Sequence, residues 1–299
     1  MPESPEVDAL AGFLRSRVVH RRIAALELEE YGALKTRDRG VGQLADRSVT
    51  GVRRFGKHVA LDTDGPALVV GFGRSGWMRW LPDTEAVTPA AGPDVSVPAA
   101  SAAPVIARLS FDDDAELELT DAGSWLSVGL WIVDDPADVP SIAKLGPDPA
   151  SADFTAADLD RILIGRRKQL KSLLQEQETL AGIGNAYSDE ILCVAGLWPL
   201  THASALDENQ RAALYRAVRE VLGDAFAQRR DVPIDQLKAH KVASMRVHGR
   251  TGQPCPDGEG IVADVPGSKG AAQYCPAQRP PDQRPPDQRP QDQRPQGLI

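Results

Sequence analysis

Residues 166–199 read RRKQLKSLLQEQETLAGIGNAYSDEILCVAGLWP, a basic amphipathic segment that leads through a glycine-containing turn into a second predicted helix. Three leucines, Leu170, Leu173 and Leu174, recur at three- and four-residue spacing and give one apolar helical face. The other side is basic, with positive charges at Arg166, Arg167, Lys168 and Lys171. This pattern predicts a nucleic-acid-binding element, although a run of charge on a helix is often merely a solvated face.

The turn in this stretch contains Gly182 and Gly184, and Asn185 stands at the predicted N-cap of the following helix. Backbone N–H groups and a short amide side chain at a helix N-terminus form a site for phosphate. An ordinary helical hairpin with a glycine turn is the alternative that this stretch alone leaves open.

The part KSLLQEQETLAGIGNAYSDEILCVAGLWP resembles the helix-two-turn-helix signature of the formamidopyrimidine-DNA glycosylase and endonuclease VIII family of DNA repair enzymes, with Glu176 where that pattern has Asp. Residues 1–8, MPESPEVD, resemble the N-terminus of the same family. Two separate motifs in the expected order are more specific than either alone. The resemblance implies an α+β fold with an N-terminal helix on a β-sandwich, a helix-two-turn-helix domain and a C-terminal zinc-ribbon β-hairpin.

The chain is predicted to have five segments. Short β-rich runs between residues 18 and 133 indicate the sandwich, and the Ala-, Pro- and Ser-rich residues 88–104 indicate a surface loop within it. Capping boxes at Thr155 and Asp207 indicate two helix starts, and the helical pattern stops after about Arg230. The predicted segments are the catalytic β-sandwich domain 1–136, the linker 137–152, the helix-two-turn-helix domain 153–238, a degenerate zinc-ribbon hairpin 239–280 and a disordered repeat tail 281–299.

The formal net charge of −8 is unusual for a protein that binds DNA, but the acidity is local. Residues 81–160 contain 16 acidic and 2 basic residues, so the remainder has 26 acidic and 32 basic residues. A positive DNA-facing surface is therefore compatible with the composition. The chain has no apolar run long enough for a membrane span and no signal pattern, and we expect a cytoplasmic monomer.

Pro2 and Glu3 are the candidate catalytic residues. Removal of Met1 would leave Pro2 with a free secondary amine, which is a nucleophile able to condense with C1′ of a damaged nucleoside. The resemblance implies that this amine displaces the base and forms an iminium with the opened sugar, while Glu3 supplies and removes protons. The alternative is that both residues simply lead into the helix predicted to begin at Ser4 and Pro5.

Further candidate residues come from the resemblance. Lys57 matches a lysine on a hairpin that contacts phosphate and assists in catalysis, and Arg53 and Arg54 beside it indicate a basic patch. Asn185 matches the asparagine that holds phosphate at the turn. Lys171 matches the lysine ahead of that turn, although it could equally belong to a solvated face.

The ribbon motif departs from the family pattern of two C-x-x-C pairs. Cys255 is followed by Gly258, and Cys275 by Gln278, at the positions of the second cysteines. Two thiolates without nearby histidines do not close a tetrahedral zinc site, so the sequence predicts no cofactor and no metal, with Cys255 and Cys275 as remnants. A zinc held through recruited ligands, such as His248 or Asp257, is the alternative that stays open. Cys193 is interpreted as a small buried residue.

The residues at the expected DNA-contact positions also differ from the family pattern. Gly270 stands where the family has a phosphate-binding arginine, and Lys269 beside it is the candidate substitute. The family also inserts three side chains into the gap left by a flipped nucleotide, and the matching positions hold Arg74, Ser124 and Trp125. We interpret Arg74 and Trp125 as an altered wedge pair.

The sequence therefore predicts a DNA repair glycosylase with abasic-site lyase activity, which excises oxidised bases from double-stranded damaged DNA through an N-terminal proline Schiff base. Two alternatives remain open at this point. One is a damage- or abasic-site-binding protein of the same fold with weak or no base excision, and the other is a lyase alone. The lesion, the opposite base and the role of the C-terminal repeat do not follow from the sequence.

Overall fold

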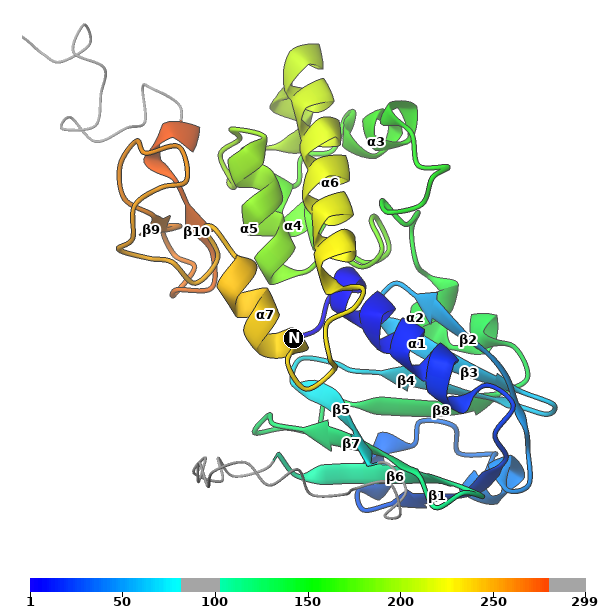
Figure 1. Ribbon diagram of the computed structural model, residues 1–299. Coiled ribbons are helices and arrows are strands. Elements are labelled where there is room, and N and C mark those ends of the chain that lie inside the picture. The colour runs from blue at the N-terminus through cyan, green and yellow to red at the C-terminus, as the bar shows by residue number, and fades with distance from the viewer. Residues whose placement is uncertain (82–102, 280–299) are drawn as a thin grey trace, which may run out of the picture. The chain divides into compact units, whose positions relative to one another are not determined.

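The computed structural model describes residues 1–81 and 103–279, which form two compact units (Figure 1). The first unit comprises residues 1–144 and 229–238, and the second comprises residues 145–228 and the chain from residue 239 onward. Most of the predicted surface loop 88–104 and the predicted tail 281–299 lie outside the described residues. Among the helices of the described ranges, none has both the length and the apolarity needed to cross a bilayer.

The first unit begins with helix α1 (Ser4–Val18), as the sequence predicts. Proline in its first turn has a backbone dihedral that suits a helix start, and Arg15 and Arg17 in its last turn complement the helix dipole. Val7, Leu10 and Leu14 recur along one face and are fully buried. This face packs against the sandwich, with contacts to β2 and β3.

The predicted β-sandwich is confirmed. One antiparallel sheet has the order β1-β6-β7-β5, and the other has the order β2-β3-β4-β8. Their inner faces share one apolar core. The strands are β1 (Ile23–Leu28), β2 (Val49–Phe55), β3 (His58–Thr63), β4 (Ala67–Gly71), β5 (Gly76–Leu81), β6 (Val105–Phe111), β7 (Glu116–Asp121) and β8 (Gly129–Val133).

The longer segment of the first unit, residues 1–144, ends in short helical turns at the start of the predicted linker 137–152. These are the 3-10 helix η4 (Pro136–Asp138) and helix α2 (Pro140–Ala143). Two other 3-10 helices, η1 (Tyr31–Ala33) and η2 (Val41–Leu44), lie between β1 and β2. The division between the two units falls after Lys144.

The second unit is built around α3 (Ala156–Leu163), α4 (Leu170–Leu174), α5 (Asn185–Val194) and most of α6 (Glu208–Arg229). The predicted capping boxes are both present. Thr155 donates its backbone N–H to Asp158 at 2.8 Å, and Gln210 donates its own to Asp207 at 2.8 Å. Such reciprocal caps satisfy backbone donors that the first helical turn leaves without partners.

Two helix predictions in this region are wrong. Residues 166–168 are not helical, because α4 begins only at Leu170 and the preceding segment forms a bridge between Gln169 and His202. The chain also returns to helix after Arg230, in α7 (Leu237–Ser244). The turn residues Pro233 and Asp235 hid this helix, since they interrupt the apolar periodicity just before it.

The C-terminal part of the second unit is a small hairpin. Strands β9 (Ala263–Asp264) and β10 (Gln273–Tyr274) pair antiparallel, and the 3-10 helix η6 (Pro276–Gln278) follows. The Tyr274 ring packs edge-on against Trp198, with ring centroids 4.5 Å apart, in a cluster with Val265 and Ala272. The predicted degenerate ribbon hairpin is therefore present.

Candidate functional site

Pro2 and Glu3 lie directly before α1, where both are buried. The backbone N–H of Glu3 donates to Glu6 Oε2 at 3.0 Å, and Glu6 Oε1 accepts from Arg229 Nε at 2.6 Å. Glu6 and Arg229 are themselves fully buried. The candidate catalytic pair is thus anchored on a buried ion pair. The Pro2 nitrogen is still in a peptide bond to Met1, so its nucleophilic form requires removal of that residue.

Lys57 lies in the two-residue turn between β2 and β3, beside Gly56, whose φ of 53° favours glycine. The predicted basic patch around it is smaller than expected. Arg53 Nε lies 2.7 Å from an Asp62 carboxylate oxygen, and Arg54 Nε lies 3.3 Å from one of Asp8. Both arginines are therefore paired with carboxylates of the same unit.

Arg74 and Trp125 are carried by two loops that one carboxylate holds together. Asp121 Oδ2 accepts from Ser127 N at 2.6 Å, from Ser127 Oγ at 2.8 Å and from Val128 N at 3.0 Å. Ser127 Oγ in turn accepts from Arg74 N at 3.0 Å. Arg74 is exposed, and the Trp125 side chain is 85% exposed. Both candidate wedge side chains are therefore exposed, on loops that Asp121 and Ser127 join by hydrogen bonds.

The same carboxylate has a perturbed acidity. Burial by itself would raise the pKa of Asp121, but the hydrogen bonds from Ser127, Gly123 and Val128 outweigh burial and hold the pKa below its ordinary value. Close packing adds to the constraint, because a Cβ at Gly73 would lie 2.1 Å from the Ser127 carbonyl oxygen.

Lys171 is buried, so the interpretation of this residue as part of a solvated face is wrong. Its Nζ donates to Asp189 Oδ1 at 2.5 Å, to Asn185 O at 3.1 Å and to Ser188 Oγ at 3.1 Å. These contacts hold Lys171 against the start of α5, and its contact with DNA stays a prediction.

Asn185 is the first residue of α5, and Gly184 takes the N-cap position that the sequence assigned to Asn185. Its Oδ1 accepts from Gln175 Nε2 at 3.1 Å, and its Nδ2 donates to Ala271 O at 2.6 Å. The amide retains one further N–H, because an Asn side chain has two. The helix start and the hairpin tip, where Lys269 is exposed with a φ of 52°, are thus tied together.

The acidic residues after Asn185 link α5 to the segment that follows α7. Asp189, whose other oxygen binds Lys171, lies 2.7 Å from His248 Nδ1. Glu190 accepts from the backbone N–H groups of Arg246 at 3.0 Å, Val247 at 2.9 Å and His248 at 2.8 Å. Buried carboxylates are costly unless they are paired in this way. These interactions hold residues 246–248, which lead into the C-terminal hairpin, against α5.

The runs of basic residues ahead of α4 are partly neutralised. Glu176 accepts from Arg166 Nη2 at 2.8 Å and from Lys168 Nζ at 2.7 Å. The hydrogen bonds from Lys168 and Thr179, together with the positive charges of Lys168 and Arg166, lower the pKa of Glu176. Exposed pairs of this kind contribute little stability. They compete with phosphate for the two basic side chains.

The cysteines form a group that the sequence did not anticipate. Cys193 Sγ, on α5, lies 4.0 Å from Cys275 Sγ, and the donor atoms of Cys255, Asp257 and Cys275 all lie within 4.8 Å of one another. Burial raises the pKa of Cys193 to about 11 and also raises those of Cys255 and Cys275. A third thiol thus lies beside a ribbon cysteine, and the absence of a bound metal stays a prediction. Three thiols and one carboxylate are a donor set that fits zinc.

Gln278, at one of the substituted ribbon positions, does not take part in this group. Its side-chain oxygen accepts from Cys275 N at 2.6 Å, and its side-chain nitrogen donates to Leu197 O at 2.9 Å. Gln278 thus stabilises the turn after Cys275 by hydrogen bonds, at a position where the family pattern has a cysteine ligand.

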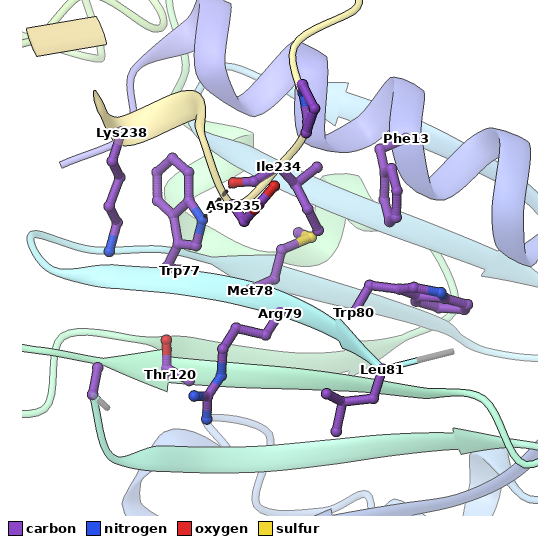
Figure 2. A pocket seen from close by; sticks show the side chains of 12 residues that line it. Phe13, Trp77, Met78, Arg79, Trp80, Leu81, Thr120, Ile234, Asp235 and Lys238 are labelled. Atoms are coloured by element: carbon purple, nitrogen blue, oxygen red, sulfur yellow. Dashed lines mark hydrogen bonds between the residues drawn. The ribbon is translucent and has the colours of Figure 1, made fainter. Parts of the chain in front are cut away.

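A separate cavity of about 670 Å³ lies in the first unit (Figure 2). Phe13, Trp77 and Trp80 line it, and the Lys238 ammonium lies 4.7 Å from the centroid of the Trp77 ring. Burial lowers the pKa of Lys238, and the negative charge of Asp121 opposes that effect. Neither Pro2, Glu3 nor Lys57 is among the described residues that line this cavity, so it is distinct from the candidate catalytic pair.

Sequence reasoning assigned no role in the site to Glu6, Arg229 or Asp189, and it did not group Cys193 with the ribbon cysteines. Glu6 alone had a local signal, since its spacing from Glu3 is that of a capping box. The others act through partners that are distant in the sequence.

Two family models match the chain. The formamidopyrimidine-DNA glycosylase N-terminal domain matches residues 1–125, and the formamidopyrimidine-DNA glycosylase H2TH domain matches residues 145–233. The curated formamidopyrimidine-DNA glycosylase of Moorella thermoacetica is 31% identical, covering 86% of this chain and 91% of the relative. That of Corynebacterium aurimucosum is also 31% identical, covering 93% and 95%.

Solved structures share the fold. A complex of the Lactococcus lactis enzyme with DNA containing N7-benzyl-Fapy-dG superposes with a TM-score of 0.77 at 22% identity, covering 93% of this chain and 99% of that one. The same protein bound non-covalently to DNA containing an abasic site gives a TM-score of 0.75 at 21% identity, with the same coverage.

Proposed function

This chain belongs to the formamidopyrimidine-DNA glycosylase family, and from that premise we propose that it excises oxidised bases from double-stranded DNA and cleaves the resulting abasic sites. The observation that carries the proposal is the position of Pro2 and Glu3 at the start of α1, anchored on the buried Glu6–Arg229 pair. The curated relatives are glycosylases by name, so a binding protein without base excision is not favoured.

In the proposed reaction, the Pro2 amine attacks C1′ of the damaged nucleoside after Met1 has been removed. The new N–C1′ bond forms as the glycosidic bond breaks, and the base leaves with the bonding electrons and takes up a proton. Opening of the sugar ring gives an iminium, with Glu3 as the group that donates and accepts protons. The iminium accepts the electrons released by proton loss at the adjacent carbon, which allows the phosphates on both sides to be eliminated.

DNA contacts are proposed for side chains in both units. Lys57 and Lys269 supply positive charge toward phosphates, and Asn185 supplies its remaining amide proton. Arg74 and Trp125 are proposed to occupy the gap left by the flipped nucleotide, because both are exposed on the loops that Asp121 holds. Lys171 is proposed to position Asn185, because its ammonium group donates to the Asn185 carbonyl oxygen.

Borohydride trapping tests the nucleophile. The processed protein should form a covalent adduct with DNA that contains an abasic site, and then with duplexes that contain a panel of oxidised bases. Pro2→Gly, or retention of Met1, should abolish the adduct on every substrate. An adduct that survives both changes would identify a lysine amine as the nucleophile and would refute the role of Pro2.

Substitution of Glu3 separates the two chemical steps. Glu3→Gln keeps the backbone N–H that donates to Glu6 and removes only the ionisable group. Base excision should fall by about 100-fold or more, whereas affinity and cleavage at preformed abasic sites should change less. Equal losses in binding and in both reactions would show that Glu3 has a structural role.

A further inference from the structure

Three thiols converge at one end of α5. Cys193 is the ninth of the ten residues of this helix, and its sulfur lies 4.0 Å from that of Cys275 at the end of the hairpin. Cys255 is 4% exposed and Cys275 is 1% exposed, and Cys193 packs against the apolar cluster that contains both. None of these cysteines is in a disulfide in the structure.

A carboxylate completes the set. An Asp257 oxygen and the sulfurs of Cys255 and Cys275 lie within 4.8 Å of one another. Two sulfurs bound to one zinc ion at about 2.3 Å and a tetrahedral angle lie about 3.8 Å apart. The distance of 4.0 Å between Cys193 and Cys275 is therefore close to the value that a shared ion requires. Cys275 belongs to both of these sets, so one ion bound at Cys275 would lie next to donors from α5 and from the first ribbon turn.

The cluster is also accessible. A cavity of about 260 Å³ is lined by Cys193 and Asp257, together with Pro256 and Arg246. An ion in this cavity would therefore meet Cys193 and Asp257, two of the four candidate ligands. Three thiolates and one carboxylate around a divalent ion leave excess negative charge, and the Arg246 guanidinium lines the same space.

We propose that this protein binds one Zn²⁺ through Cys193, Cys255, Cys275 and Asp257. The ligand set takes one thiolate from α5 and a carboxylate from the first ribbon turn, in place of the second cysteines of two C-x-x-C pairs. The proposal concerns structure rather than catalysis, and it stands independently of the proposed glycosylase activity.

Such a site would give α5 two attachments to the hairpin. Asn185, at the first position of the helix, already binds Ala271 O in the hairpin tip. Cys193 lies eight residues further on, which is roughly 12 Å along the helix axis. A zinc ion there fixes the other end of α5 to the base of the hairpin. Metal binding would then stabilise the positions of Asn185 and Lys269.

Metal analysis of the full chain tests the proposal directly. The protein, expressed with zinc in the medium and purified under reducing conditions, should contain about one zinc per chain. Cys193→Ser should weaken zinc affinity by more than about 100-fold, because loss of residues that merely orient ligands already weakens metal binding about 10- to 100-fold. Val194→Ala, next to it on the same cavity, should retain the metal.

The role of Asp257 is tested by one variant and one matched control. Asp257→Asn should lower the affinity, whereas Glu259→Gln, an exposed carboxylate two residues away, should not. Cobalt(II) added to the metal-free protein should give thiolate-to-metal charge-transfer bands of tetrahedral character, and these should diminish in Cys193→Ser. This spectrum reports the ligands without reference to DNA cleavage.

Three results would overturn the proposal. One is wild-type protein that takes up neither zinc nor cobalt. Another is Cys193→Ser that binds zinc as tightly as the wild type. The third is fewer than three free thiols in the denatured wild-type protein as purified, which would show a disulfide in place of a metal site. If Cys193→Ser does not fold, the wild-type metal content and the change in its melting temperature on chelation still decide the matter.

Discussion

The Arg229 guanidinium lies 2.6 Å from the Glu6 carboxylate, and neither side chain is more than 1% exposed. These residues are separated by 223 positions in the sequence. The second oxygen of Glu6 accepts from the backbone N–H of Glu3, so the ion pair also fixes the residue proposed as acid and base. A substitution of Arg229 is therefore expected to affect Glu3 at the N-terminus, although the two residues are far apart in the sequence.

Arg229→Met should destabilise the protein by about 3–5 kcal/mol, because it leaves the Glu6 carboxylate buried without its cation. Urea denaturation followed by circular dichroism measures this change. The neighbouring Arg230→Met, at an exposed position, should have little effect. The double variant Arg229→Met/Glu6→Gln should be more stable than Arg229→Met, and equal stability would indicate that Glu6 is not charged in the folded state.

Lys57→Ala should weaken binding to damaged and undamaged duplexes alike. It should also reduce the slope of log affinity against log salt by about one unit, because each phosphate neutralised by a lysine releases about one counterion. Binding measured at several salt concentrations gives the slope. Asn185→Ala is the matched comparison, since a neutral amide should lower affinity with little change of slope.

Lys171→Met should behave differently from Lys57→Ala. Its ammonium group is hydrogen-bonded to Asp189, Asn185 and Ser188, so its loss should lower stability by about 3–5 kcal/mol and lower affinity without a change in the salt slope. Denaturation and salt-dependent binding of the same preparation test this together. A slope reduced by a full unit at unchanged stability would show that Lys171 contacts phosphate after all.

The stability that Asp121 contributes by holding its loop should depend on pH. Because its pKa in the folded protein is below the ordinary value, Asp121 contributes stability that is fully present above the unfolded pKa. That contribution is lost as the pH falls below about 4 through the folded pKa. The difference in unfolding free energy between wild type and Asp121→Asn should thus be largest near neutral pH and shrink in acid. A constant difference would argue against this ionisation.

Trp125→Ala should change the discrimination between damaged and intact duplex more than it changes protein stability. The side chain is 85% exposed, so its removal costs little packing. If the indole fills the gap left by a flipped nucleotide, the ratio of affinities for damaged and intact duplex should fall while the salt slope stays the same. Arg74→Ala should act in the same direction. An Arg74→Ala variant that mimics Lys57→Ala instead would identify Arg74 as a phosphate contact.

The amino-acid sequence alone determined the features that depend on near neighbours. The start of α1 at Ser4, the capping boxes at Thr155 and Asp207 and the alternating strands of the sandwich follow from residues a few positions apart. Local hydrogen bonds and side-chain periodicity set these elements, so the pattern is legible without a fold. The two motifs at residues 1–8 and 171–199 indicated the family for the same reason.

Only the tertiary structure decided the roles of residues whose partners are remote. Lys171 looked like a surface lysine, and its burial depends on Asp189, which a turn brings back to it. Cys193 looked like an isolated helical thiol until the hairpin placed Cys275 beside it, 82 positions later. Helical spacing says which face a side chain occupies, but not what covers that face. Whether a charge is paired or a thiol has neighbours is set by packing between elements, and that information is not local.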